Sequence, residues 1–157
     1  MVAALDHTWI AAHIPHQGRM CLLESVLTWD GERIACVAIN HRLPDHPLCQ
    51  HGRLGAACGI EYAAQAMAIH GALVSDQDAP PRPGMLISVR AVDLHVNRLD
   101  DIPHDLVVEA ERISGDLGLL LYQFKVCGAD RCLLEGRASV LLDRGTTVPT
   151  NASFLHD

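Results

Sequence analysis

Apolar and polar positions along this chain separate one predicted helix from the strands around it. Residues 55–74, GAACGIEYAAQAMAIHGALV, form a nearly uninterrupted apolar run of helix length, which predicts a buried helix. Two β-rich stretches precede it, residues 20–29 and 33–40, and Asp30-Gly31 between them predicts a hairpin turn. The first part of the chain therefore orders as strand, turn, strand and helix.

The second half of the chain predicts strands alone. The proline-rich segment 75–84 ends the helix, and four β-rich stretches follow at residues 85–96, 105–113, 119–126 and 132–142. Two strands, one long helix and four further strands predict an α+β fold, an antiparallel sheet wrapped around a single helix. A short helix is expected in the N-terminal segment and a loosely ordered tail from residue 144. Six strands leave part of the helix uncovered, so we expect a dimer.

Length and charge narrow the class of protein. The 157 residues suit one domain, residues 1–157. A net charge of −7, with a single lysine, argues against nucleic acid as a partner. The helix at residues 55–74 contains Glu61, Gln65 and His70 and is rich in alanine, so it predicts a buried helix and no membrane partner. The start of the chain lacks a secretion signal, and the six cysteines show no CxxC pair, which predicts a cytoplasmic protein with reduced thiols.

The carboxylate of Glu61 is the strongest candidate for chemistry. Burying a charged side chain without partners is unfavourable, so Glu61 is expected to be hydrogen-bonded, to have a shifted pKa, or to line a cleft. Gln65 follows it by four residues and Cys58 precedes it by three, which predicts a polar stripe on one helix face. The alternative is a structural acid bonded to a neighbouring strand, with Gln65 as a structural hydrogen-bonding group.

The ten histidines and six cysteines do not suggest a metal ion. The close pairings are His13 with His16, His46 with Cys49, and Cys49 with His51, and none comes with a second matching pair. We therefore predict no metal and no cofactor. His16 is expected to position the N-terminal segment.

Three stretches of the chain resemble one family, the hotdog-fold FabZ-type 3-hydroxyacyl-ACP dehydratases. Residues 14–26, IPHQGRMCLLESV, are similar to the family's opening Pro-His pattern and strand. Glu61, Gln65 and residues 66–68 resemble its Glu-Ala-Met-Ala-Gln helix segment, and residues 84–101 its strand after the helix. The form GRLGAACGIEYAAQAMAIHGAL is similar to a divergent, dehydratase-like branch associated with aryl-polyene and related fatty-acid-like pathways. The resemblance implies a hotdog fold and a dehydratase.

The loop that carries the family's catalytic histidine is altered in this chain. The family has a Gly-His-Phe-Pro loop whose histidine lies fourteen residues before the helix acid, but Pro47 stands at that position here. His46 is adjacent to it, and His51 follows a glutamine much as the family histidine follows Gln-Gly. The resemblance therefore implies His51 or His46 as the base, and the further alternatives are His41 or no catalytic histidine at all. In the family, histidine and acid come from different subunits, so a dimer is implied.

Dehydration of a 3-hydroxyacyl thioester needs a base for the carbon-2 proton and an acid for the departing hydroxyl. Histidine suits the base, and a Glu61 whose pKa is raised by burial suits the acid. Backbone N–H groups around Ala56 and Ala57 are expected to polarise the thioester carbonyl, because a helix N-terminus favours negative charge. Gln65 and Cys58 complete the expected substrate-binding set.

The family's substrate is carried on acyl carrier protein, which implies local cationic contacts on an acidic chain. Arg42, Arg53, Arg90 and Arg98 are the candidates. Two other functions fit the same sequence. A thioesterase of the same fold would use the helix acid to activate water and need no histidine. A non-catalytic subunit would pair with an active hotdog partner in a heterodimer.

Overall fold

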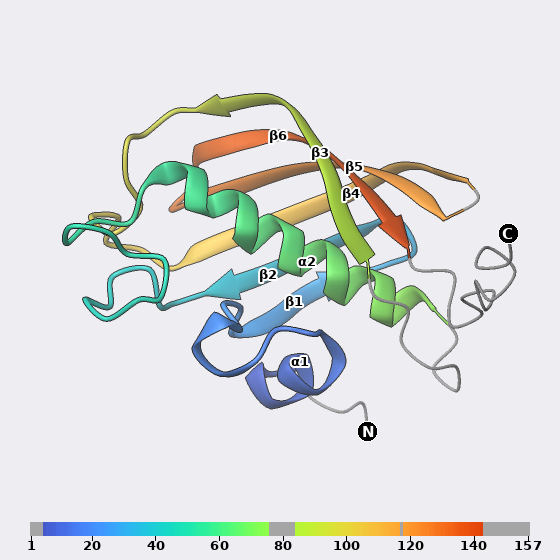
Figure 1. The fold of residues 1–157 in the computed structure, drawn as a ribbon, viewed down its shortest axis with the longest axis horizontal. Coiled ribbons are helices and arrows are strands. Elements are labelled where there is room, and N and C mark those ends of the chain that lie inside the picture. The colour runs from blue at the N-terminus through green and yellow to red at the C-terminus, as the bar shows by residue number, and fades with distance from the viewer. Residues whose placement is uncertain (1–4, 76–83, 117, 143–157) are drawn as a thin grey trace, which may run out of the picture.

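The computed structural model describes residues 5–75, 84–116 and 118–142, and these form two α-helices and one six-stranded sheet (Figure 1). The elements are α1 (His7–His13), β1 (Ser25–Trp29), β2 (Arg33–Ala38), α2 (Gly59–Val74), β3 (Gly84–Leu94), β4 (Leu106–Asp116), β5 (Leu119–Gly128) and β6 (Arg131–Leu142). Short 3-10 turns precede β1 (Gly18–Met20) and α2 (Ala56–Cys58). In the described ranges no helix combines the length and the apolar character that crossing a bilayer requires.

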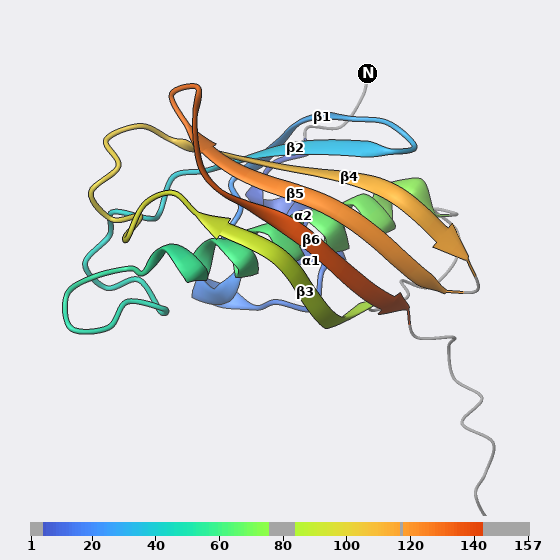
Figure 2. The same ribbon diagram turned by 90° about the horizontal axis from the view of Figure 1, so that it is seen from above.

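The sheet is antiparallel throughout and has the strand order β1-β2-β4-β5-β6-β3. Figure 2 shows it as one curved layer with α2 lying along one of its faces. The predicted architecture, an antiparallel sheet around one long helix, is confirmed. Strands β1 and β3, far apart in the sequence, form the two edges.

Helix α2 packs against β2, β4 and β5 and forms the core with them. Alternate residues of these strands point to the helix, as period-2 patterning requires, and are at most 3 % exposed: Ile34, Cys36, Val108, Ala110, Phe124 and Val126. Near the start of the helix, a Cβ on Gly59 would lie 2.5 Å from a methyl carbon of Leu134 on β6. This glycine therefore allows the helix to approach the sheet closely.

Several predicted boundaries differ from those of the structure. The strand expected at residues 20–29 begins at Ser25, because a 3-10 turn occupies Gly18–Met20. The helix expected from residue 55 begins as the turn Ala56–Cys58 and becomes α-helical at Gly59. The short N-terminal helix is confirmed as α1, where the Asp6 side chain accepts from Trp9 N at 3.0 Å. The tail from residue 144 lies outside the described residues.

Both edge strands are irregular. A register shift interrupts the β1–β2 pairing between Val26 and Thr28, and two shifts interrupt the β3–β6 pairing. Within the second of these, Ala91 has a φ of 51°, a conformation that favours glycine. Strand β3 also exposes large apolar side chains, including Met85 and Ile87. An edge of this kind suits contact with another protein surface.

A buried histidine network joins α2 to the sheet. The His70 ring donates from Nε2 to the Asp30 carbonyl at 2.9 Å, so its Nδ1 accepts from the Tyr122 hydroxyl at 2.7 Å. Arg112 donates to the same hydroxyl at 3.2 Å. Burial lowers the pKa of His70, and Arg112 nearby lowers it further, although the hydrogen bond to Asp30 opposes them. The buried ring is therefore neutral near pH 7.

We predict that the free energy of unfolding falls as the pH drops below about 6.5. Burial lowers the pKa values of His41, His46 and His70 in the folded protein, so below the ordinary value the unfolded chain binds protons that the folded chain does not. Each histidine contributes a slope of up to about 1.4 kcal/mol per pH unit. Urea denaturation between about pH 7 and pH 5 measures it. His70→Gln should reduce the slope and the exposed-site control His104→Gln should not; equal slopes in all three proteins would contradict the prediction.

Candidate functional site

Glu61 lies in the first turn of α2, and two side chains contact its carboxylate. His16 Nε2 lies 3.0 Å from Oε1, and Gln65 Nε2 donates to the same oxygen at 3.2 Å. The side chains of His16 and Glu61 are 26 % and 34 % exposed, so the pair is sheltered and still reachable. One chain thus brings a histidine, a carboxylate and an amide together. Chemically, this group can accept, hold and return a proton.

Gln65 is fully buried and fixes the position of the other two side chains. Its amide oxygen accepts from Leu22 N at 2.8 Å, and its amide nitrogen donates to Met20 O at 2.7 Å as well as to Glu61. These bonds attach the segment before β1 to the helix. The predicted pairing of Glu61 with Gln65 along one helix face is present. A direct role of Gln65 in substrate binding stays a prediction, because its oxygen and nitrogen already have partners within the chain.

His16 is the site residue that the sequence analysis assigned to another role. It lies between α1 and the turn Gly18–Met20, and the expected positioning of the N-terminal segment is combined with direct contact to Glu61. Its Nδ1 atom is buried and has no hydrogen-bond partner among the described residues. The Pro15-His16 pair was a visible signal, but 45 residues of chain separate His16 from Glu61, and the path between them is not readable from spacing.

The pKa of Glu61 moves in the opposite direction from the one expected. The hydrogen bond with His16 lowers it most, the bond from Gln65 lowers it further, and burial opposes both. The expectation of a carboxylic acid protonated by desolvation is therefore wrong for this chain. The hydrogen bonds from His16 and Gln65 stabilise the ionised carboxylate more than its half-burial destabilises it. Glu61 is ionised near neutral pH.

His46 is held by the chain at both ring nitrogens. Nδ1 accepts from Leu48 N at 3.0 Å, so Nε2 carries the proton and donates to the Tyr62 hydroxyl at 2.9 Å. That hydroxyl donates in turn to Asn40 Oδ1 at 2.6 Å. Burial lowers the pKa of His46, and the nearby charges of Arg19 and His41 lower it further. A catalytic role for His46 stays a prediction, and in this chain the ring anchors the loop to α2.

His51 and His41 differ in exposure. His51 is exposed and has a φ of 53°, in a tight turn closed by two backbone bonds between Gln50 and Arg53. His41 is buried and donates from Nε2 to Ile102 O at 3.0 Å. Within the described part of the chain the His51 ring has no hydrogen bond. It remains available to a substrate or a second subunit, and its predicted role is untested.

The residues ahead of the helix offer less than expected for binding a thioester carbonyl. The Ala56 N–H donates to Asn97 O at 3.1 Å, whereas Ala57 is exposed. Cys58 is half-buried, its thiol lies 4.0 Å from Leu48 O, and burial raises the pKa of that thiol. Ala57 is therefore the more accessible of the two candidate carbonyl-binding positions.

The predicted carrier-binding arginines have different surroundings. Arg98 is half-buried and forms an ion pair with Asp100, whose carboxylate also accepts from Leu54 N at 3.0 Å. The side chains of Arg42, Arg53 and Arg90 are exposed. Arg98 therefore stabilises the loop before α2, and the other three are open to a partner.

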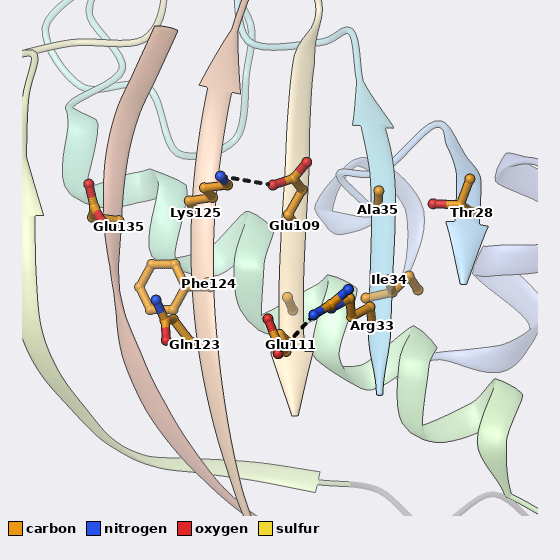
Figure 3. A pocket seen from close by; sticks show the side chains of 11 residues that line it. Thr28, Arg33, Ile34, Ala35, Glu109, Glu111, Gln123, Phe124, Lys125 and Glu135 are labelled. Carbon is orange, nitrogen blue, oxygen red and sulfur yellow. Dashed lines mark hydrogen bonds and ion pairs between the residues drawn. The ribbon is translucent and has the colours of Figure 1, made fainter. Parts of the chain in front are cut away.

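A groove of about 380 Å³ lies on the outer face of the sheet, away from α2 (Figure 3). Two ion pairs cross its floor, Lys125 with Glu109 at 3.5 Å and Arg33 with Glu111 at 3.4 Å. None of the predicted site residues lines it. The groove and the His16–Glu61 pair are on opposite faces of the sheet, so this groove is not the candidate active site.

Solved structures with the same architecture define the class. The dehydratase heterocomplex ApeI:P from Xenorhabdus doucetiae matches with a TM-score of 0.77 at 20 % identity, over 90 % of this chain and 92 % of that one. A thioesterase family protein from Silicibacter pomeroyi matches with a TM-score of 0.64 at 14 % identity, over 88 % and 96 %. An HP0420 homologue from Helicobacter felis gives 0.59 at 14 %, over 84 % and 85 %. The chain has the hotdog fold.

The family follows from the sequence match. The model of the ApeP-like family, described as ApeP dehydratase, matches residues 8–148. This protein belongs to the ApeP dehydratase family, and the resemblance to hotdog-fold dehydratases is confirmed. Among curated proteins, none matches the chain.

We predict that the Glu61 carboxylate titrates below the usual glutamate range and that His16→Ala raises its midpoint. The hydrogen bond with His16 is the largest cause of the lowered pKa, and burial, which raises it, remains in the variant. Carbon-13 NMR of the glutamate side-chain carboxyl carbons measures the midpoint. His13→Ala, which removes an exposed histidine of α1, serves as the matched control. An unchanged midpoint in His16→Ala would show that the pair does not form in solution.

Proposed function

We propose that this protein dehydrates 3-hydroxyacyl thioesters carried on acyl carrier protein to trans-2-enoyl thioesters, in aryl-polyene or related fatty-acid-like biosynthesis. Membership of the ApeP dehydratase family supports the reaction class. The observation that carries the proposal is the 3.0 Å contact between His16 and Glu61. It gives one chain both a proton acceptor and a proton donor.

The reaction breaks a C–H bond and a C–O bond and needs no cofactor. The proton at carbon 2 leaves, its electron pair forms the double bond to carbon 3, and the hydroxyl departs with a proton as water. Glu61 takes the first proton, because its lowered pKa keeps it ionised, and the His16 ring, 3.0 Å from Glu61, supplies the second. This assignment reverses the roles expected from the sequence. After the pair exchanges one proton internally, its original protonation is restored.

Gln65 acts as a positioning residue in this scheme. Its amide nitrogen holds the Glu61 carboxylate, and its bonds to Met20 and Leu22 hold the segment that follows His16. General acid–base catalysis depends on placing groups within hydrogen-bond reach of the transferred proton. Exposed Ala57, ahead of α2, is the position where a thioester carbonyl can meet backbone N–H groups.

The protein is proposed to work with a second hotdog subunit, either a copy of itself or a different chain. The free edge of β3 and its exposed side chains Met85 and Ile87 support this pairing. His51 is exposed on the loop before α2 and is proposed to reach the partner's substrate. The acyl carrier protein is proposed to dock near Arg42 and Arg53, since both arginines are exposed. A cytoplasmic location goes with this function.

A thioesterase of the same fold is the second candidate function. The ionised state of Glu61 favours it, because a carboxylate of lowered pKa can hold and orient an attacking water. The two reactions give different products. Dehydration leaves the acyl group on the carrier and removes one water, whereas hydrolysis releases a free thiol.

We predict that Glu61→Gln and His16→Ala each lower dehydration by at least about 100-fold, since general acid–base catalysis contributes 10²- to 10⁴-fold. Intact mass spectrometry of 3-hydroxyacyl carrier protein follows the loss of water, and a thiol reagent follows hydrolysis. His13→Ala is the histidine control, and His51→Ala tests the loop histidine in parallel. Each protein is assayed alone and with a second hotdog subunit.

The possible results separate the candidate functions. Full activity of His16→Ala with loss of activity in His51→Ala would contradict the proposed pair and return the role to the loop. Thiol release without loss of water would support the thioesterase. Inactivity of this protein alone, together with activity of the pair that Glu61→Gln leaves unchanged, would identify a non-catalytic subunit.

A further inference from the structure

A second group of reactive side chains lies at the other side of the sheet, around the start of β6. Within the described residues, ligand atoms of His95, Cys132 and Glu135 lie within 4.8 Å of one another. His95 Nε2 is 2.9 Å from Glu135 Oε2, and the Cys132 thiol is 3.4 Å from that oxygen. Cys127 is the cross-strand partner of Cys132 on β5. None of these residues belongs to the proposed catalytic site.

An irregularity in β6 creates this grouping. Residues three apart on a regular strand face opposite sides of the sheet, so Cys132 and Glu135 would normally point apart. Here Val126 pairs with Leu134, whereas the next residue, Cys127, pairs with Cys132, so Leu133 is an extra residue. Both Leu133 and Leu134 are buried as a result. The extra residue turns Cys132 to the face that carries Glu135.

His95 directly follows β3 and lies beside the same irregularity in β6. Leu94 pairs with Leu134, and the His95 N–H then donates to Leu133 O at 2.8 Å. The backbone of His95 is thus bonded to the extra residue itself. Bulges of this kind occur next to functional sites, where they redirect a side chain. The positions of all three ligands depend on Leu133.

We propose that His95, Cys132 and Glu135 form a binding site for one zinc-type divalent cation. An imidazole nitrogen, a thiolate sulfur and a carboxylate oxygen form a donor set that suits Zn²⁺ and leaves a fourth position for water. Bonds of about 2.0–2.3 Å in a tetrahedron separate neighbouring ligand atoms by about 3.3–3.8 Å. The present separations of 2.9 Å and 3.4 Å need adjustments of less than about 1 Å to reach that geometry.

The surroundings support a cation at this position. Lys125 is a cationic neighbour, and Glu109 pairs with it at 3.5 Å. Figure 3 shows Lys125 and Glu135 side by side on the outer face, and Asp93 is the cross-strand neighbour of Glu135. Along these neighbouring strands there are thus three carboxylates for one ammonium group. The side chains of His95 and Glu135 are each 44 % exposed, which gives an ion access from solvent.

Spacing along the sequence gave no sign of this site. His95 is separated from Cys132 by 37 residues, and Cys127 and Cys132 do not form a CxxC pair. The absence of a metal expected from the sequence rested on close pairings in the chain. The three side chains come close because β6 pairs with both β3 and β5 and contains one bulge.

Cobalt(II) titration of the reduced full-length protein tests the proposal. Tetrahedral Co²⁺ with thiolate ligands gives visible ligand-field bands and a near-ultraviolet thiolate charge-transfer band, and Zn²⁺ should abolish both by displacement. We expect one ion per chain. Cys132→Ser should remove the thiolate charge-transfer band. It should also weaken Zn²⁺ binding by more than about 100-fold, because the loss of groups that only orient a metal ligand already lowers metal affinity by about 10- to 100-fold.

Matched controls come from the other thiols and histidines. Cys49→Ser, on the loop before α2, and His104→Gln, an exposed histidine, should leave the spectrum unchanged. His95→Gln should weaken binding, and because that side chain is exposed it carries the test if Cys132→Ser does not fold. Binding without thiolate charge transfer, retention of wild-type affinity in both site variants, or a signal lost in Cys49→Ser would overturn the proposal.

Discussion

The buried amide of Gln65 is the interaction on which the geometry of the candidate site depends. It bonds to the backbone at Met20 and Leu22 and to the carboxylate of Glu61. An unpaired polar group at this depth would cost about 1–3 kcal/mol, so the chain before β1 has a strong reason to follow one path. That path places His16 against Glu61. The fold and the proton-transfer pair are thus linked through one side chain.

Sequence reasoning succeeded where a local pattern determined the outcome. The apolar run around Glu61 indicated the central helix, and the four-residue spacing to Gln65 gave their shared face. The β-rich stretches gave the strands within a few residues, and the hotdog resemblance gave their arrangement. Sequence reasoning placed the start of β1 too early, because residues 20–22 bond to the distant Gln65 side chain, and no local pattern records such a long-range contact.

The remaining features depend on packing that no local pattern records. The pKa of Glu61 is a balance between burial and two hydrogen-bond partners. The sequence suggested a different role for one of these partners, His16, which was expected to position the N-terminal segment. His46 resembled a catalytic histidine in sequence, yet the chain engages both of its nitrogens. The extra residue Leu133 changes which side of β6 faces Cys132, and a bulge has no clear signature in an apolar run.

The register shifts in β1 and β3 bear on how this sheet meets other strands. An incoming strand forms a ladder only where the edge offers consecutive, evenly spaced N–H and C=O groups, and both edges break that spacing within a few residues. The left-handed backbone at Ala91 bends the longer edge as well. Edge-to-edge growth into open fibres is thereby disfavoured at both ends of the sheet. A partner shaped to the irregular edge can still dock, so the bulges select for a specific neighbour against indiscriminate polymerisation.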